Sequence, residues 1–186
     1  MPGGRGGRMS RKILVTGPPG CGKTTVVRKV AEILGENAAG FYTEEIRDAK
    51  KQRIGFRVVT LDGKRGELAD KISGRGPQVG SYRVNVESFE RVALPSLEME
   101  EGRILIVDEI GKMECFSETF VRRVQEILQA GSPFLATIPL RGGGDFLEEI
   151  RRQRDAKTFT VTPENRETLP AQIAAMLSAL VKEGND

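Results

Sequence analysis

Short apolar runs alternate along this chain with longer stretches in which apolar residues recur every three or four positions. The runs at 13–15, 103–108 and 134–138 predict strands, and their unbroken apolar character is typical of strands buried on both faces of a parallel sheet. The periodic stretches predict helices. Together they indicate an α/β fold with three layers and a mostly parallel central sheet. The helical stripes consist of Val26, Val27, Val30, Ile33 and Leu34, of Phe116, Phe120, Val121, Val124, Ile127 and Leu128, and of Leu169, Ile173, Met176, Leu177, Leu180 and Val181.

A different pattern fills the segment at about 40–85, which we expect to be a small β-rich insertion. Apolar and polar residues alternate at 53–61, which predicts a strand, and Asp62-Gly63 is a hairpin turn signal. A short strand is expected at 67–69, and the glycines and proline at 74–77 indicate a loop.

Local signals set the limits of the predicted helices. Asn85 is expected to cap a helix that begins near Glu87, and Pro95 to split it, because an interior proline breaks the hydrogen-bond ladder. Gly131 is expected to end the second of the striped helices. Thr162-Pro163 is expected to open the final helix, with the proline at its first position.

A glycine hinge at 141–144 leads into a short basic helix, and a last strand is expected at 157–161. Arg151, Arg152 and Arg154 follow the hinge, so the segment at about 141–155 is a candidate lid that closes on a bound triphosphate. A solvated basic face is the more common origin of such a cluster, and both interpretations stay open.

The segment Gly17-Pro18-Pro19-Gly20-Cys21-Gly22-Lys23-Thr24 fits G-x-x-x-x-G-K-[ST], the phosphate-binding P-loop. It lies between a predicted strand and a predicted helix, as that motif requires. Its glycines allow backbone N–H groups to surround an anion, and the N-terminus of the helix faces the same point. Lys23 is expected to reach the β- and γ-phosphates, and the Thr24 hydroxyl to bind Mg²⁺. The segment therefore predicts nucleotide binding, and Thr25, the next residue, is expected to belong to the same site.

A second phosphate-site motif ends the run at 103–108. Asp108 follows a buried strand at the sheet edge where ligands bind in α/β folds, so we expect it to hold Mg²⁺ through a water opposite Thr24. Glu109 then lies where a carboxylate can orient and deprotonate a water aimed at the γ-phosphate. Because the chain contains no histidine, any general base must be a carboxylate. The acid pair favours hydrolysis over transfer to an acceptor, whereas the alternative is a solvated turn.

Several neighbouring polar residues have two interpretations. Residues 108–111 also fit the D-x-x-G of GTPases, whose glycine N–H contacts the γ-phosphate, but the N-K-x-D that reads guanine is missing. Lys112 either stabilises transition-state charge or is a solvated turn residue. Thr137 either holds the attacking water or makes a core hydrogen bond, and Asn165 either donates to the base or caps a helix.

The predicted nucleotide-binding residues are Gly17, Pro18, Pro19, Gly20, Cys21, Gly22, Lys23, Thr24, Thr25, Ile104, Leu105, Ile106, Val107, Asp108, Glu109, Ile110, Gly111 and Asn165, and the predicted catalytic residues are Glu109, Lys23 and Lys112.

Composition narrows the class of protein. A chain of 186 residues, 38% hydrophobic and 30% charged, is typical of one soluble domain, here 11–182, with a disordered Gly/Arg arm at 1–10 and a tail at 183–186. No apolar run approaches the about 20 residues of a membrane span. Two cysteines and no visible secretion signal favour a cytoplasmic protein, which we expect to be a monomer. The net charge of +3 arises from basic residues at 1–12, so a large nucleic-acid-binding face is not indicated.

The order of the motifs resembles a known family. GPPGCGKTT, GFYTEEIR, GFRVVTLDG, NVESFE, ILIVDEIGKME and VTPENR follow one another, and over about 11–182 the chain resembles the small thermophile-type P-loop nucleoside-triphosphatases. The resemblance implies a RecA-like domain with a β-rich insertion. It also implies Mg²⁺-dependent hydrolysis of ATP, GTP, CTP and UTP to the diphosphate and phosphate, with loose base selectivity. On the family pattern, Glu109 and Lys112 are expected to matter for catalysis.

Two other functions remain compatible with these motifs. A small P-loop nucleotide or nucleoside kinase shares the size, the P-loop and a basic lid. A nucleic-acid-stimulated NTPase would use the arm, whose GGRGGR sequence resembles short RNA-binding segments.

Overall fold

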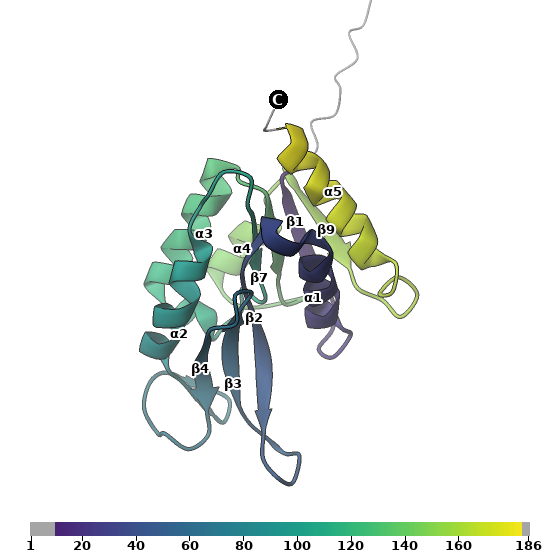
Figure 1. The fold of residues 1–186 in the computed structure, drawn as a ribbon. Helices are drawn as coiled ribbons and strands as arrows, with labels where there is room; N and C mark the ends of the chain where they lie inside the picture. Colours follow the sequence, from purple (N-terminus) through teal and green to yellow (C-terminus); the bar gives the residue numbers. More distant parts are fainter. Residues whose placement is uncertain (1–9, 184–186) are drawn as a thin grey trace, which may run out of the picture.

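The computed structural model describes residues 10–183, so most of the predicted arm and tail lie outside the described residues. Its middle layer is one nine-stranded sheet with the order β5-β6-β4-β3-β2-β7-β8-β1-β9 (Figure 1). Within residues 10–183, no helix is long and apolar enough to cross a membrane. The strands are β1 Lys12–Thr16, β2 Ala38–Arg47, β3 Arg53–Thr60, β4 Arg65–Asp70, β5 Gln78–Val79, β6 Tyr82–Val84, β7 Ile104–Val107, β8 Phe134–Thr137 and β9 Ala156–Thr160, and the α-helices are α1 Lys23–Leu34, α2 Val86–Ala93, α3 Glu118–Ala130, α4 Asp145–Arg151 and α5 Leu169–Glu183.

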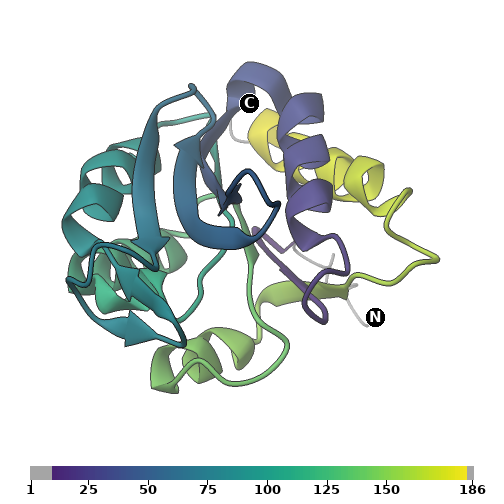
Figure 2. The same ribbon diagram turned by 90° about the horizontal axis from the view of Figure 1, so that it is seen from below.

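The strands β2, β7, β8, β1 and β9 run parallel. Every residue of β1, β7 and β8 is buried, whereas the edge strand β9 is largely exposed. Leu14 of β1 packs in the cluster formed with α2, α3 and α4, whereas Ile13 and Val15 pack in the cluster formed with α1 and α5. Figure 2 shows these two helical layers on opposite sides of the sheet. Burial on both faces explains why the apolar runs are unbroken. The predicted α/β fold is therefore confirmed.

The strand β2 belongs to both halves of the sheet. Its residues 38–41 pair in parallel with β7, and residues 41–47 pair antiparallel with β3. The segment at 40–85 thus continues the same sheet. Gly40 allows the close approach of β7, since its φ is +119° and a Cβ there would lie 1.9 Å from the Ile106 carbonyl oxygen. The β2–β3 hairpin and the loop between β1 and α1 project from the same edge of the sheet (Figure 1).

The predicted caps at Asn85 and Gly131 are found in the structure. The Asn85 side chain accepts a hydrogen bond from the Ser88 N–H over 3.0 Å and begins α2, and Gly131 ends α3 in the left-handed conformation. The helix before Pro95 ends at Ala93 and continues only as a 3₁₀ turn over Leu94–Leu97. The proline therefore ends α2.

The predicted start of the last helix at Thr162-Pro163 is wrong, because α5 begins at Leu169. Asn165 explains the difference. Its side-chain oxygen accepts from the Thr162 N–H over 2.9 Å, and its amide nitrogen donates to the Thr160 carbonyl over 2.8 Å. These bonds hold residues 160–165 in a loop that competes with helix formation.

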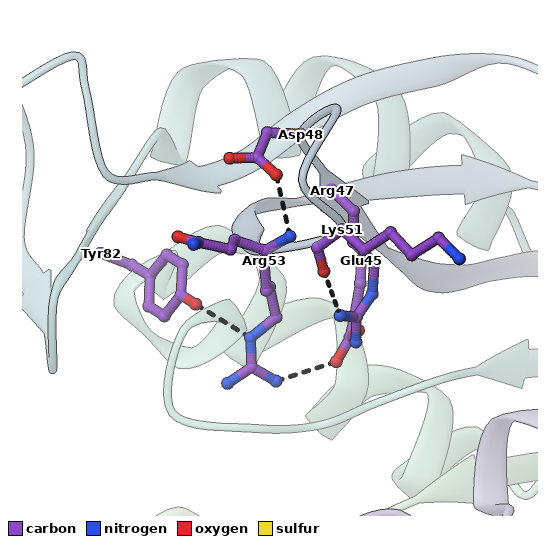
Figure 3. Close-up of polar contacts among 7 residues, drawn as sticks. Glu45, Arg47, Asp48, Lys51, Arg53 and Tyr82 are labelled. Atoms are coloured by element: carbon purple, nitrogen blue, oxygen red, sulfur yellow. Dashed lines mark hydrogen bonds and ion pairs between the residues drawn. The ribbon is translucent and has the colours of Figure 1, made fainter.

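A polar network orders the tip of the β2–β3 hairpin (Figure 3). Arg53 donates to the Tyr82 hydroxyl over 2.9 Å and to the Glu45 carboxylate over 2.8 Å. Arg47 contacts the same carboxylate and donates to the Lys51 carbonyl over 2.8 Å. These bonds tie the hairpin to β6, so the extension has a defined shape where it projects past the parallel strands.

Candidate functional site

The P-loop has the geometry that its sequence predicts. The loop joins β1 to α1, and Gly17, Gly20 and Gly22 all have positive φ angles. At Gly17 a Cβ would lie 2.6 Å from the Cys21 sulfur, so a side chain there is excluded by space as well as by conformation. The Lys23 Nζ donates to the Gly17 carbonyl over 3.1 Å, which holds the ammonium over the loop. A cation and the N-terminus of α1 therefore meet at one point, as an anion site requires.

Asp108 follows β7 at the carboxyl edge of the parallel strands and is 1% exposed. The Thr137 hydroxyl, at the end of β8, donates to its Oδ1 over 2.5 Å. Burial raises the pKa of Asp108, and the hydrogen bond from Thr137 and the nearby Thr24 hydroxyl and Thr43 backbone oppose that rise. Thr24 and Asp108, the two predicted metal ligands, therefore lie together.

The unused oxygen of Asp108 tests whether the site suits a divalent cation. Its Oδ2 is buried and has no hydrogen-bond partner within residues 10–183. An orphaned carboxylate oxygen is costly unless a water or a cation satisfies it. Together with the Thr24 hydroxyl it supplies the oxygen ligands that Mg²⁺ prefers. The residues present fit the predicted metal.

Glu109 lies one residue beyond Asp108 and is partly buried. Burial raises the pKa of its carboxyl, the nearby Asp108 carboxylate raises it further, and the Lys23 ammonium lowers it. The Glu109 side chain therefore lies within the electrostatic field of both the P-loop lysine and the β7 acid.

Glu114 is a site residue that the sequence interpretation missed. It lies in a 3₁₀ turn, Glu114–Phe116, and only 4% of it is exposed. Burial, and then the charge of Glu109, raise the pKa of Glu114 to about 8. Its only sequence signal is its position at the end of DEIGKME, because a glutamate in a charged segment is ordinarily exposed.

The Gly111 amide gives no support to the GTPase interpretation of residues 108–111. Its N–H donates to Glu114 Oε2 over 3.2 Å, so this donor already has a partner inside the protein. The Gly111 carbonyl accepts from the Cys115 N–H over 3.1 Å. Gly111 therefore serves the turn that follows it.

Other predicted residues divide into buried and exposed groups. The side chains of Ile104–Val107 and Ile110 lie in the buried core, on the strand that leads to the candidate site and in the segment just after it. Pro18, Pro19, Thr25 and Lys112 are exposed. The amide of Asn165 has backbone partners at both of its polar atoms.

The three arginines after the glycine hinge do not act together in this structure. Arg151 donates to the Pro139 and Gly142 carbonyls over 2.8 and 2.7 Å, and it pairs with Glu148. Arg152 is exposed, and Arg154 borders a cavity at the amino ends of the parallel strands, with Lys12 and Gly102. That edge is opposite the P-loop, so Arg154 lies away from the predicted triphosphate site.

Comparison with known proteins identifies relatives along almost the whole chain. The nucleoside-triphosphatase THEP1 of Aquifex aeolicus is 43% identical, and the alignment covers 89% of this chain and 98% of the relative. The human cancer-related nucleoside-triphosphatase is 42% identical, with 92% and 98% covered.

Solved structures agree with these sequence matches. The crystal structure of THEP1 from Aquifex aeolicus has a TM-score of 0.82 at 41% identity, covering 89% of this chain and 98% of that one. The solution structure of the human cancer-related nucleoside triphosphatase has a TM-score of 0.76 at 42% identity, covering 91% and 98%. A family model described as NTPase matches residues 12–174. The chain therefore belongs to this NTPase family, as the order of its sequence motifs predicts.

Proposed function

We propose that this nucleoside-triphosphatase hydrolyses ATP, GTP, CTP and UTP to the diphosphate and phosphate, that it requires Mg²⁺, and that it selects weakly among the bases. One observation carries the proposal. Thr24 and Asp108 meet at the carboxyl edge of the parallel sheet, with Lys23 over the P-loop and Glu109 directly beyond Asp108. The names of the relatives, nucleoside-triphosphatases, support the same reaction class.

The proposed binding step uses the P-loop. Its backbone N–H groups and the N-terminus of α1 bind the phosphate oxygens, and the Lys23 ammonium moves from the Gly17 carbonyl to the β- and γ-phosphates. Thr24 and Asp108 would hold Mg²⁺, the latter through a water, and the bound ion would neutralise charge on the phosphates. The orphaned Oδ2 of Asp108 is the atom available for that contact.

Glu109 is the proposed general base. Hydrolysis needs a group that orients a water and accepts its proton as the water attacks the γ-phosphorus. Burial and Asp108 raise the pKa of the Glu109 carboxyl, which makes it a stronger base than an exposed glutamate. The Lys23 ammonium limits this rise and keeps the carboxylate available.

Two observations on the residues that could recognise the nucleotide base support weak base selectivity. The sequence contains no N-K-x-D, and both polar atoms of the Asn165 amide, our candidate base donor, are engaged with the backbone at the Thr162 N–H and the Thr160 carbonyl. A base would then be held through stacking and shape, which distinguish the four bases poorly.

A phosphate-release assay with each of the four nucleotides, in Mg²⁺ and in EDTA, tests the proposal. Glu109→Gln is expected to lower kcat at least about 100-fold while nucleotide affinity stays within about twofold, because the base is lost and the P-loop is intact. Glu101→Gln, in an exposed turn before β7, is the matched control. Normal turnover by Glu109→Gln would exclude Glu109 as the base.

The same assay separates the alternatives. Phosphorylated product that forms only with an added nucleoside or monophosphate would assign the protein to the kinases. The arm at 1–9 lies outside the described residues, so its proposed role is tested by deletion. Stimulation by RNA that disappears on deletion and weakens with salt would support a nucleic-acid-dependent enzyme.

A further inference from the structure

We propose that Glu114 is a positioning residue for hydrolysis, which fixes the Gly111 backbone and the carboxylate of Glu109 through its buried carboxyl group. The inference rests on the proposed role of Glu109 as the base. Glu114 is not expected to touch the nucleotide, since its side chain is buried in the 3₁₀ turn that precedes α3.

Hydrogen bonds from three sides fix the backbone after Glu109. The Ile110 N–H donates to the Thr137 carbonyl over 2.9 Å, which joins this segment to β8. The Gly111 N–H donates to Glu114 Oε2 over 3.2 Å, and the Gly111 carbonyl accepts from Cys115 over 3.1 Å. The Glu114 carboxyl is the one side chain in this set, so it is the link that a substitution can remove without altering the backbone.

The missing side chain of Gly111 leaves space that two carboxyl groups share. Glu109 Oε1 and Glu114 Oε2 each lie 2.8 Å from the position that a Cβ of residue 111 would occupy. Both oxygens therefore border the same space above Gly111. Any movement of the Glu114 carboxyl changes the space and the field in which Glu109 is oriented.

The two carboxyl groups differ in burial and in how firmly they are held. Burial, and then the charge of Glu109, raise the pKa of Glu114, so the two carboxyl groups interact electrostatically as well as through the space they share. Glu114 is the more deeply buried of the two, and its Oε2 is held by the Gly111 N–H over 3.2 Å. The fixed position of Glu114 therefore limits the orientations open to Glu109.

Glutamine and methionine at position 114 separate positioning from packing. Glu114→Gln keeps an acceptor for the Gly111 N–H, whereas Glu114→Met keeps only the volume. We expect Gln to retain kcat within about threefold and Met to lose about 10- to 100-fold, with the affinity for ATP unchanged, since misplacing a reacting group costs rate rather than binding. Glu90→Met is the control, because Glu90 contacts the same turn through Ser117 and does not reach Gly111.

A double-mutant cycle tests whether Glu114 acts through Glu109. Single-turnover hydrolysis is compared in the wild type, Glu109→Gln, Glu114→Met and the double variant, well below the midpoint of thermal unfolding. The double variant should be no slower than Glu109→Gln alone, because the positioned group is already gone. Losses that multiply, or a normal kcat in Glu114→Met, would overturn the inference. A wild type that releases no phosphate would instead refute the proposed function.

Discussion

The Thr137 hydroxyl donates to Asp108 Oδ1 over 2.5 Å, whereas Oδ2 of the same carboxylate has no partner within residues 10–183. One oxygen is thus fixed by the neighbouring strand β8, and the other is free to meet a ligand. Parallel strands bring this about, because β7 and β8 are adjacent and both end at the same edge. Asp108 and Thr137 are 29 residues apart in the sequence, and the pairing of β7 with β8 brings them together.

Thr137→Val removes this hydroxyl and keeps the side chain's shape. We expect Mg²⁺-dependent phosphate release to fall about 10- to 100-fold, since residues that orient a metal-binding carboxylate carry effects of that size. The Mg²⁺ concentration for half-maximal rate should rise. Thr60→Val is the control, because Thr60 is a buried threonine at the end of β3. A normal Mg²⁺ dependence in Thr137→Val would show that the bond is only structural.

Gly111→Ala tests the space between the two glutamates. The Cβ would meet Glu109 Oε1 and Glu114 Oε2 at 2.8 Å, and side-chain ends move more easily than backbone, so the carboxyl groups should shift while the fold persists. We expect kcat to fall about 100-fold with unchanged nucleotide affinity. Gly66→Ala, on β4, is a matched control, since its Cβ would lie 2.7 Å from a methyl carbon of the Val92 side chain. Equal rates for the two variants would contradict the prediction.

The elements that sequence predicts well are those with local causes. The strand β1, the P-loop and α1 follow from an apolar run, three glycines and a helical stripe, and Asp108 follows from its position after β7. These signals depend on residues within a few positions of each other. They were sufficient for the fold and for the predicted nucleotide site.

The features that sequence predicts poorly depend on contacts between distant segments. The strands β5 and β6, of two and three residues, are too short for a periodic pattern. The pairing of β2 with β7 joins the β-rich segment to the main sheet, and no local signal encodes it. Glu114 is buried only because its turn folds back on Gly111, whereas glutamates are ordinarily exposed.

Arg151→Ala should loosen the loop after β8 without impairing nucleotide binding. The guanidinium bonds the Pro139 and Gly142 carbonyls, so its removal unties the loop and leaves the partly buried Pro139 carbonyl without this partner. We expect the free energy of unfolding to fall by about 1–3 kcal/mol and hydrogen exchange at 139–144 to accelerate. Arg152→Ala, at an exposed position, should change neither quantity. A raised KM for ATP in Arg151→Ala would favour the lid interpretation instead.

Stability should fall as pH rises from about 5 to 8, because of Glu114. Its pKa is 4.5 in an ordinary environment and about 8 in the folded protein. Between these values the folded state keeps a proton that the unfolded chain has released, so each added pH unit favours unfolding by up to about 1.4 kcal/mol. The pKa values of Asp108 and Glu109 are also raised, and they act in the same direction.

The composition of the chain makes this pH window informative. There is no histidine to titrate near neutrality, and burial raises the pKa of Cys115 to about 12. The carboxyls with lowered pKa values, among them Glu45 and Asp155, affect stability only at more acidic pH. Urea unfolding at pH 5, 6, 7 and 8, without nucleotide or metal, measures the slope. Glu114→Gln should flatten it, whereas the exposed control Glu101→Gln should not. An equal slope in Glu114→Gln and the wild type would mean that folding does not raise the pKa of Glu114.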